Sequence, residues 1–123
     1  VYDLVWFREG DGSDFSSGSD RQSRMAFERF MSSHVSAGTE ELKAYSPVHQ
    51  VERIQDEVFI VHGGNDVRVP VGHAERLRDA LEAHDKPYRW MIKEEEGHGF
   101  FDVDNRVDLY DAALDFFNDH IGR

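Results

Sequence analysis

The sequence predicts an α/β fold in which a small parallel sheet of two to three strands is flanked by helices. Two observations carry this prediction. Strand-like and helix-like segments alternate over the C-terminal half, and residues 57–62 form an almost unbroken run of β-branched and aromatic residues. Strands that are buried on both faces of a parallel sheet have such runs. The alternation is typical of parallel strands joined by right-handed helical crossovers.

The N-terminal third is less regular. Residues 1–7 are mostly apolar and predict a third strand. Residues 8–23 are rich in Gly, Ser and Asp, which compete with regular structure for backbone hydrogen bonds, and this composition predicts a mobile surface loop. An irregular helical stripe follows over 24–33, and residues 39–44 form a further helical turn before Ser46-Pro47.

The C-terminal half contains the clearest elements. Residues 51–54 form a short connector, and the strand 57–62 ends at Gly63-Gly64. Pro70 opens a helix that runs to His84, and residues 88–93 form the next strand. Asn105 is expected to cap a terminal helix. The apolar face of that helix is predicted to pack in the core and consists of Val107, Tyr110, Leu114, Phe117 and Ile121.

Composition excludes several classes of function. The chain has 14 basic and 25 acidic residues, a net charge of −11, which disfavours nucleic acids and anionic membranes because both are bound through Lys and Arg. It has no cysteine, so disulfides and thiolate metal sites are impossible and the cellular compartment stays open. No apolar run approaches the roughly 18 residues of a membrane span. Neither a cofactor nor a metal is expected.

Two residues with catalytic chemistry follow the two predicted parallel strands. Asp66 lies after the strand 57–62, and His98 lies after the strand 88–93. Since active residues of parallel sheets lie on loops at the carboxyl ends of strands, both side chains are expected at the same edge. Taken singly, Asp66 has a second interpretation as a turn or helix cap, and His98 as a solvated loop residue.

The surrounding motifs resemble the C-terminal end of the prolyl oligopeptidase family of serine peptidases, which have the α/β-hydrolase fold. The resemblance covers residues 46–121. It depends on Ser46-Pro47 before the strand, on His62-Gly-Gly-Asn-Asp66 with Val69-Pro70 after it, and on Glu96-Gly-His98-Gly-Phe100 before the terminal helix. It implies that residues 1–123 are part of an α/β-hydrolase catalytic domain.

The resemblance also implies roles for the two residues. His98 would be the general base that takes the proton of the nucleophilic serine, and Asp66 would orient the imidazole. Gly97 and Gly99 would let the backbone bend tightly around His98. The nucleophile of this triad precedes its acid in the chain and lies in Gly-x-Ser-x-Gly, and nothing upstream of Asp66 matches that motif. Ser13, in Gly10-Asp-Gly-Ser-Asp14, does not fit it.

Other polar groups have competing interpretations. His62 with Asp66 and His98 suggests a metal site, but the short spacings typical of His ligands are missing. The acidic run 94–96 suits either a substrate amine or a solvated loop face. Some aromatic side chains are expected in an exposed patch, namely Trp6, Phe7, Phe15, Phe27 and Phe30.

The sequence therefore predicts the C-terminal fragment of a serine peptidase that cleaves peptide or acyl-peptide bonds in its complete form. The fragment itself is expected to be inactive, because it lacks the nucleophile. Two alternatives stay open: a non-catalytic interaction module with hydrolase architecture, and a fragment of an esterase. A peptide is the expected substrate partner of the complete enzyme. A homo-oligomer is expected through the exposed sheet edge, since an unpaired edge strand presents free backbone groups.

Overall fold

The computed structural model describes residues 1–13, 21–34 and 38–122, without the side chains of Arg24 and His34. Its centre is a two-stranded sheet of β1 (Val58–Gly63) and β2 (Tyr88–Lys93). The strands are parallel, with Val58 opposite Tyr88 and Gly63 opposite Lys93, so both end at the same edge. Helix α4 (Gly72–Ala83) connects them, and α5 (Val103–Ile121) follows β2. The predicted α/β architecture and both predicted strands of the C-terminal half are confirmed.

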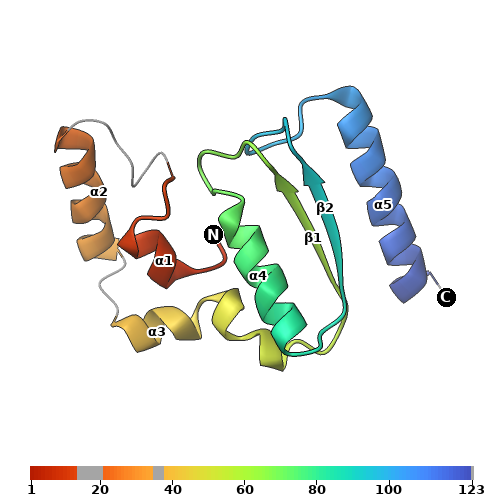
Figure 1. Ribbon diagram of the computed structural model, residues 1–123, viewed down its shortest axis with the longest axis horizontal. Helices are drawn as coiled ribbons and strands as arrows, with labels where there is room; N and C mark the ends of the chain where they lie inside the picture. The colour runs from red at the N-terminus through yellow and green to blue at the C-terminus, as the bar shows by residue number, and fades with distance from the viewer. Residues whose placement is uncertain (14–20, 35–37, 123) are drawn as a thin grey trace.

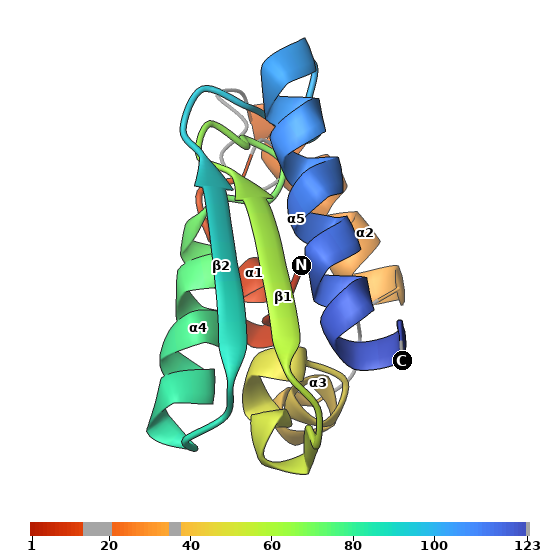
Figure 2. The ribbon, with the colours of Figure 1, turned by 90° about the vertical axis from the view of Figure 1, so that its right-hand side faces the viewer.

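The two long helices lie on opposite faces of the sheet (Figures 1 and 2). The buried core is formed with α4: Ile60 packs against Ala74, Leu77 and Leu81, together with Val51. On the other face, the ring of Phe59 lies 5.6 Å from that of Phe116 in α5. Successive side chains of β1 thus enter different layers, as the two-residue period of a strand requires. This explains why nearly every position of β1 is apolar.

The N-terminal segment is a helix, so the prediction of a third strand over residues 1–7 is wrong. Helix α1 spans Leu4–Glu9, and the Asp3 carboxylate accepts hydrogen bonds from the backbone N–H groups of Val5 and Trp6. A side-chain oxygen at this position satisfies N–H groups that have no partner within the helix. The cap therefore outweighs the strand preference of the apolar run.

The predicted loop over residues 8–23 is shorter in the structure. Its first two residues belong to α1, and its last three belong to α2 (Arg21–His34). Between them, Asp11 and Ser13 are buried, so this part of the segment is not a solvated surface loop. Residues 14–20, with Phe15, lie outside the described residues.

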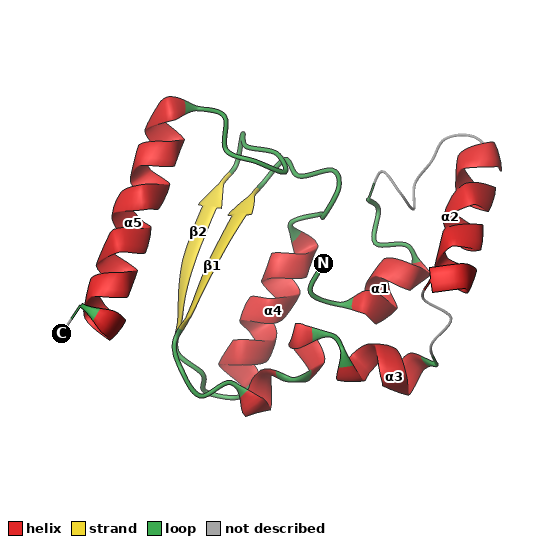
Figure 3. Cartoon of the chain, turned by 180° about the vertical axis from the view of Figure 1, so that it is seen from behind, coloured by secondary structure: helices red, strands yellow, loops and turns green. Residues whose placement is uncertain are grey.

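The connecting elements agree with the remaining predictions. Helix α2 contains the expected helical stretch, and α3 spans Thr39–Ala44 as predicted. Two short 3₁₀ helices, η1 (Pro47–His49) and η2 (Val51–Arg53), then lead to β1. Figure 3 shows these helices gathered at one side of α4, away from α5. Among the described residues, no helix is both long and apolar enough to cross a membrane.

Helix α5 differs from the prediction in two ways. Its N-cap is Asp102, which accepts a hydrogen bond from the backbone N–H of Asn105, so Asn105 is not the cap. The apolar face predicted to be core is exposed instead. Another row of the helix, containing Leu109 and Phe116, is half-buried toward the sheet. The exposed residues are Val103, Val107, Tyr110, Leu114, Phe117 and Ile121.

Candidate active site

The loop after β1 holds Asp66 in a fixed position. The Asp66 carboxylate is buried, and its Oδ1 accepts hydrogen bonds from the backbone N–H groups of Arg68 and Val69, both at 2.9 Å. An aspartate that binds backbone groups two and three residues ahead closes a tight turn. Oδ2 of the same carboxylate then remains for a partner outside the loop. The local turn and the contact with His98 thus use different oxygens of one side chain.

The loop after β2 holds His98, and Glu96 anchors it. The Glu96 carboxylate is only 5 % exposed and accepts hydrogen bonds from the backbone N–H groups of Phe101 and Asp102 and from Nδ2 of Asn105. These hydrogen bonds lower the pKa of Glu96, and the bond from the Phe101 backbone has the largest effect. Glu94 and Glu95 are exposed. The acidic run is therefore not a uniform solvated face, since its last member supports the backbone on either side of His98.

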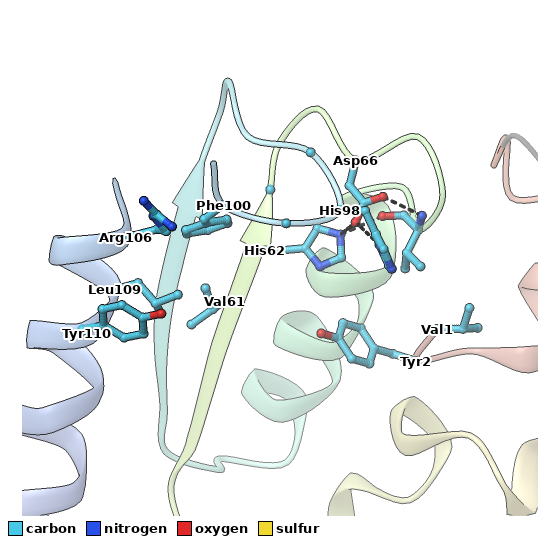
Figure 4. Close-up of a pocket in the computed structure, with 14 residues that line it drawn as sticks. Val1, Tyr2, Val61, His62, Asp66, His98, Phe100, Arg106, Leu109 and Tyr110 are labelled. Atoms are coloured by element: carbon cyan, nitrogen blue, oxygen red, sulfur yellow. Dashed lines mark hydrogen bonds and ion pairs between the residues drawn. The ribbon is translucent and has the colours of Figure 1, made fainter. Parts of the chain in front are cut away.

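The two loops bring the predicted pair together. Nδ1 of His98 lies 2.9 Å from Oδ2 of Asp66 (Figure 4). Because a carboxylate only accepts hydrogen bonds, Nδ1 must carry the proton and donate it. In the neutral imidazole this leaves the lone pair on Nε2, which is the atom a general base uses. The His98 side chain is 55 % exposed and that of Asp66 is 5 % exposed, so the base can be reached while its partner is shielded.

Hydrogen bonds keep Asp66 ionised despite its burial. Burial alone would raise the pKa of this carboxyl, but the bonds from the Val69 backbone, from His98 and from the Arg68 backbone outweigh it, and the pKa is lowered. Hydrogen bonds to the charged form of a carboxylate have this effect. Asp66 is therefore a carboxylate at neutral pH, as an acceptor for the His98 ring must be.

His62 and Tyr2 are neighbours of this pair. Nε2 of His62 is 2.7 Å from the carbonyl oxygen of Val69 and therefore donates to it, and it lies 3.7 Å from Oδ2 of Asp66. The Tyr2 ring contacts His62 edge to face. Burial, followed by the charge of Asp66, raises the pKa of Tyr2, so its hydroxyl stays neutral. No sequence pattern indicated a role for Tyr2, because its contact with His62 joins residues that are far apart in the chain.

The metal interpretation of His62, Asp66 and His98 has no geometric support. In the part of the chain that the structure describes, no group of three or more His, Cys, Asp or Glu side chains is arranged to hold a metal ion. The contacts of His62 and His98 are those of hydrogen-bonded imidazoles. Each ring has one nitrogen engaged by an oxygen of the Asp66 loop.

The glycines that allow this geometry are not those expected. Gly97 and Gly99 do not have positive φ, and a Cβ at Gly97 would lie 3.9 Å from the carbonyl oxygen of Asn65, an ordinary contact distance. A Cβ at Gly63, in contrast, would lie 2.1 Å from the carbonyl oxygen of Gly97 and 2.4 Å from that of Glu96. The two loops approach so closely that only glycine fits at the end of β1.

A pocket of about 410 Å³ opens beside the pair. Its walls come from the end of β1, from the loops after β1 and β2, from the first two residues of the chain and from α5 (Figure 4). His98, Asp66 and His62 line one part, and Arg106, Leu109 and Tyr110 line another. Among the residues that the structure describes, none of those lining the pocket is a serine. Ser13 is fully buried elsewhere, and Ser16, Ser17 and Ser19 lie outside the described residues.

Comparisons with known proteins agree with the resemblance seen in the motifs. The model of the prolyl oligopeptidase family matches residues 17–123. The chain is 26 % identical over 85 residues to dipeptidyl peptidase family member 6 of Caenorhabditis elegans, which covers 69 % of this chain and 12 % of that protein. It is 30 % identical over 69 residues to dipeptidyl aminopeptidase BIII of Pseudoxanthomonas mexicana, which covers 56 % of this chain and 10 % of that protein.

A solved structure has the same fold. The puromycin-hydrolyzing peptidase of Mycobacterium tuberculosis matches 99 % of this chain with a TM-score of 0.78 and 24 % identity, over 17 % of its own length. This match confirms the predicted α/β-hydrolase fold class. The chain spans about a tenth of the length of the curated relatives above. Since the family model covers residues from 17 to the last, this chain belongs to the prolyl oligopeptidase family.

Proposed function

We propose that this chain supplies the acid and the base of a serine peptidase triad, whose nucleophile belongs to a part of the complete enzyme that precedes Val1. The observation that carries the proposal is the contact between Nδ1 of His98 and Oδ2 of Asp66, 2.9 Å apart, at the carboxyl ends of two parallel strands. Nδ1 is the ring nitrogen of His98 that contacts Asp66, which leaves Nε2 for another partner, and His98 is one of the residues that line the pocket (Figure 4).

The reaction follows from this arrangement. Nε2 of His98 takes the proton of the serine hydroxyl while the serine oxygen bonds to the substrate carbonyl carbon. The imidazolium that forms is stabilised by Asp66, which is ionised. His98 then returns the proton to the leaving amine as the carbon–nitrogen bond breaks, and water hydrolyses the acyl-enzyme by the same route. Asp66 orients the ring throughout and is not itself protonated.

The names of the curated relatives support a peptide substrate. Both are dipeptidyl peptidases by name, which favours hydrolysis of peptide or acyl-peptide bonds over ester hydrolysis. The 123-residue chain alone is inactive in this proposal, because it contains no Gly-x-Ser-x-Gly motif and no serine is among the described residues that line the pocket. A stand-alone interaction module would not need a carboxylate that holds the tautomer of an accessible histidine.

The test has two arms. In the first, the purified chain and its His98→Ala variant are treated with excess fluorophosphonate probe, and their intact masses are measured. We expect no adduct in either protein. A stoichiometric adduct that His98→Ala abolishes would mean that a serine of this chain completes the triad.

In the second arm, the product of the whole reading frame is assayed with a chromogenic peptide substrate. We expect Asp66→Asn to lower kcat by about four orders of magnitude, the effect of presenting the wrong histidine tautomer. Asp79→Asn, on the exposed face of α4, is the matched control and should leave kcat unchanged. Peptidase activity that survives His98→Ala, or a reading frame without a nucleophilic serine, would refute the proposal.

A further inference from the structure

His62 is a buried polar residue at the end of an apolar strand. The four residues before it in β1 are apolar, and it lies on the same face of the strand as Ile60 because side chains alternate between the faces. Its side chain is only 6 % exposed. A buried imidazole must find hydrogen-bond partners, whereas an apolar side chain at this position would need none. Packing alone therefore does not explain a histidine here.

The hydrogen bond of His62 leads to the loop that holds Asp66. Nε2 of His62 lies 2.7 Å from the carbonyl oxygen of Val69. Because that oxygen only accepts, Nε2 carries the proton and donates it. The backbone N–H of the same Val69 donates to Oδ1 of Asp66 at 2.9 Å. Both backbone polar groups of Val69 are thus engaged, and His62 acts on the Asp66 carboxylate through this one residue.

The His62 ring is itself held by segments outside that loop. The Tyr2 ring lies against it, with the ring centroids 6.1 Å apart and an interplanar angle of 62° (Figure 4). The backbone of Tyr2 is fixed in turn, since its carbonyl oxygen accepts from the N–H of Val48 at 3.2 Å and its own N–H donates to Nδ1 of His73 at 3.4 Å. Through His62, the loop is therefore tied to η1 and to α4.

These contacts determine where Asp66 directs its second oxygen. The two oxygens belong to one planar carboxylate, so a bond that fixes Oδ1 also fixes the direction of Oδ2. Oδ2 is the atom that lies 2.9 Å from Nδ1 of His98. Nε2 of His62 is 3.7 Å from Oδ2, which is too far for a hydrogen bond. His62 therefore does not compete with His98 for this oxygen.

We propose that His62 is a positioning residue of the triad. It holds the Val69 carbonyl and thereby keeps Oδ2 of Asp66 directed at His98, while it neither takes a proton in the reaction nor touches a reacting atom. This inference rests on the proposed function and adds a further residue to it. His62 also lines the pocket, so the competing role is direct contact with the substrate. Kinetics separates the two roles, because lost positioning lowers kcat, whereas a lost substrate contact raises KM and leaves kcat unchanged.

Three substitutions of His62 separate the donor from the shape of the side chain. His62→Gln keeps an N–H donor at the position of Nε2, His62→Asn moves it to the position of Nδ1, and His62→Leu removes it. In the product of the whole reading frame, we expect His62→Asn and His62→Leu to lower kcat by about 10- to 100-fold with little change in KM. His62→Gln should restore most of the activity.

The matched control is His84→Leu, at the exposed end of α4, which should leave kcat unchanged. Far-UV circular dichroism confirms that each variant is folded. If His62→Leu does not fold, the comparison of His62→Gln with His62→Asn still tests the placement of the donor, since both side chains are amides. Equal kcat values for these two variants, or a change confined to KM, would overturn the proposal.

A spectroscopic measurement on the 123-residue chain tests the same point without the rest of the enzyme. The Nδ1 proton of His98 gives a downfield NMR signal when its bond to Asp66 protects it from exchange with water. We expect this signal in the wild type and in His62→Gln, and we expect its loss in His62→Asn. A signal of equal strength in His62→Asn would overturn the positioning role.

The outcomes distinguish this inference from the proposed function. If Asp66→Asn lowers kcat and His62→Asn does not, the positioning role of His62 is wrong and the triad assignment stands. If Asp66→Asn also leaves kcat unchanged, the proposed function fails, and the positioning role fails with it.

Discussion

Replacing Gly63 with alanine tests whether the close approach of the two loops sets the geometry of the Asp66–His98 pair. The new Cβ would lie 2.1 Å from the carbonyl oxygen of Gly97 and 2.4 Å from that of Glu96, whereas real Cβ contacts essentially never fall below 3.0 Å. Both neighbours are backbone atoms and cannot rotate away. The loops must therefore separate by about 0.9 Å to remove the overlap with Gly97, as packed atoms do not interpenetrate.

A separation of this size is enough to break the hydrogen bonds that join the two loops. If it falls along the bond between Asp66 and His98, their distance grows from 2.9 Å to about 3.8 Å, which is no longer a hydrogen bond. The backbone bond from Asn65 to Glu96, now 2.9 Å, would lengthen as well. Overpacking costs about 1–3 kcal/mol, and each lost hydrogen bond about 1 kcal/mol. We expect Gly63→Ala to lower the free energy of unfolding by about 2–4 kcal/mol.

Urea unfolding followed by far-UV circular dichroism measures the loss. Gly97→Ala is the matched control, since its Cβ would lie 3.9 Å from the carbonyl oxygen of Asn65 and Gly97 does not have positive φ. That variant should be as stable as the wild type, or more stable by up to about 1 kcal/mol because the unfolded chain loses entropy. Equal stability of Gly63→Ala and Gly97→Ala would refute the reasoning.

Three further predictions concern buried polar groups. Glu96→Gln should lower the urea midpoint, because an amide offers one acceptor oxygen where three donors now converge; an unchanged midpoint would show that the carboxylate does not anchor the loop. Burial lowers the pKa of His73 below its ordinary 6.5, so the unfolded chain binds this proton at a higher pH than the folded chain does. The wild type should therefore lose stability as the pH falls through 6.5. His73→Gln should lose less stability in the same titration. Asp66, whose folded pKa is below its ordinary 3.8, contributes stability that is full above about pH 5 and is lost as the pH falls through the folded pKa. Asp66→Asn should flatten the acid limb of that curve, and a limb identical to that of the wild type would contradict the pKa direction.

The sequence was sufficient to predict the strands and the meeting of Asp66 with His98. Both residues follow runs rich in β-branched and aromatic residues, which are typical of strands, and parallel neighbours bring their ends together. The spacing of apolar residues in the sequence could not predict which other elements cover a given face of a helix. The spacing placed the exposed apolar residues of α5 on one face, but their exposure depends on which other elements reach them. The Asp3 cap was missed because the apolar residues around it have high strand propensity.

Close approaches between segments that are distant in the chain could also not be predicted from the sequence. The glycines beside His98 suggested a tight bend, whereas the tight contact is between Gly63 and the backbone of the other loop, 34 positions away at Gly97. Likewise, Glu96 belonged to an acidic run, and its burial depends on three donors that follow it and fold back. Such roles become visible only when both loops are placed in space.

The protonation state of the His98 ring tests the central claim most directly. Long-range nitrogen–proton NMR of the labelled chain at pH 8 distinguishes a proton on Nδ1 from one on Nε2. The bond to Asp66 predicts that Nδ1 of His98 is protonated and Nε2 is not, and that Asp66→Asn removes this preference. A proton on Nε2 in the wild type, or the same tautomer in Asp66→Asn, would contradict the assignment of Asp66 and His98 as the acid and base of a triad.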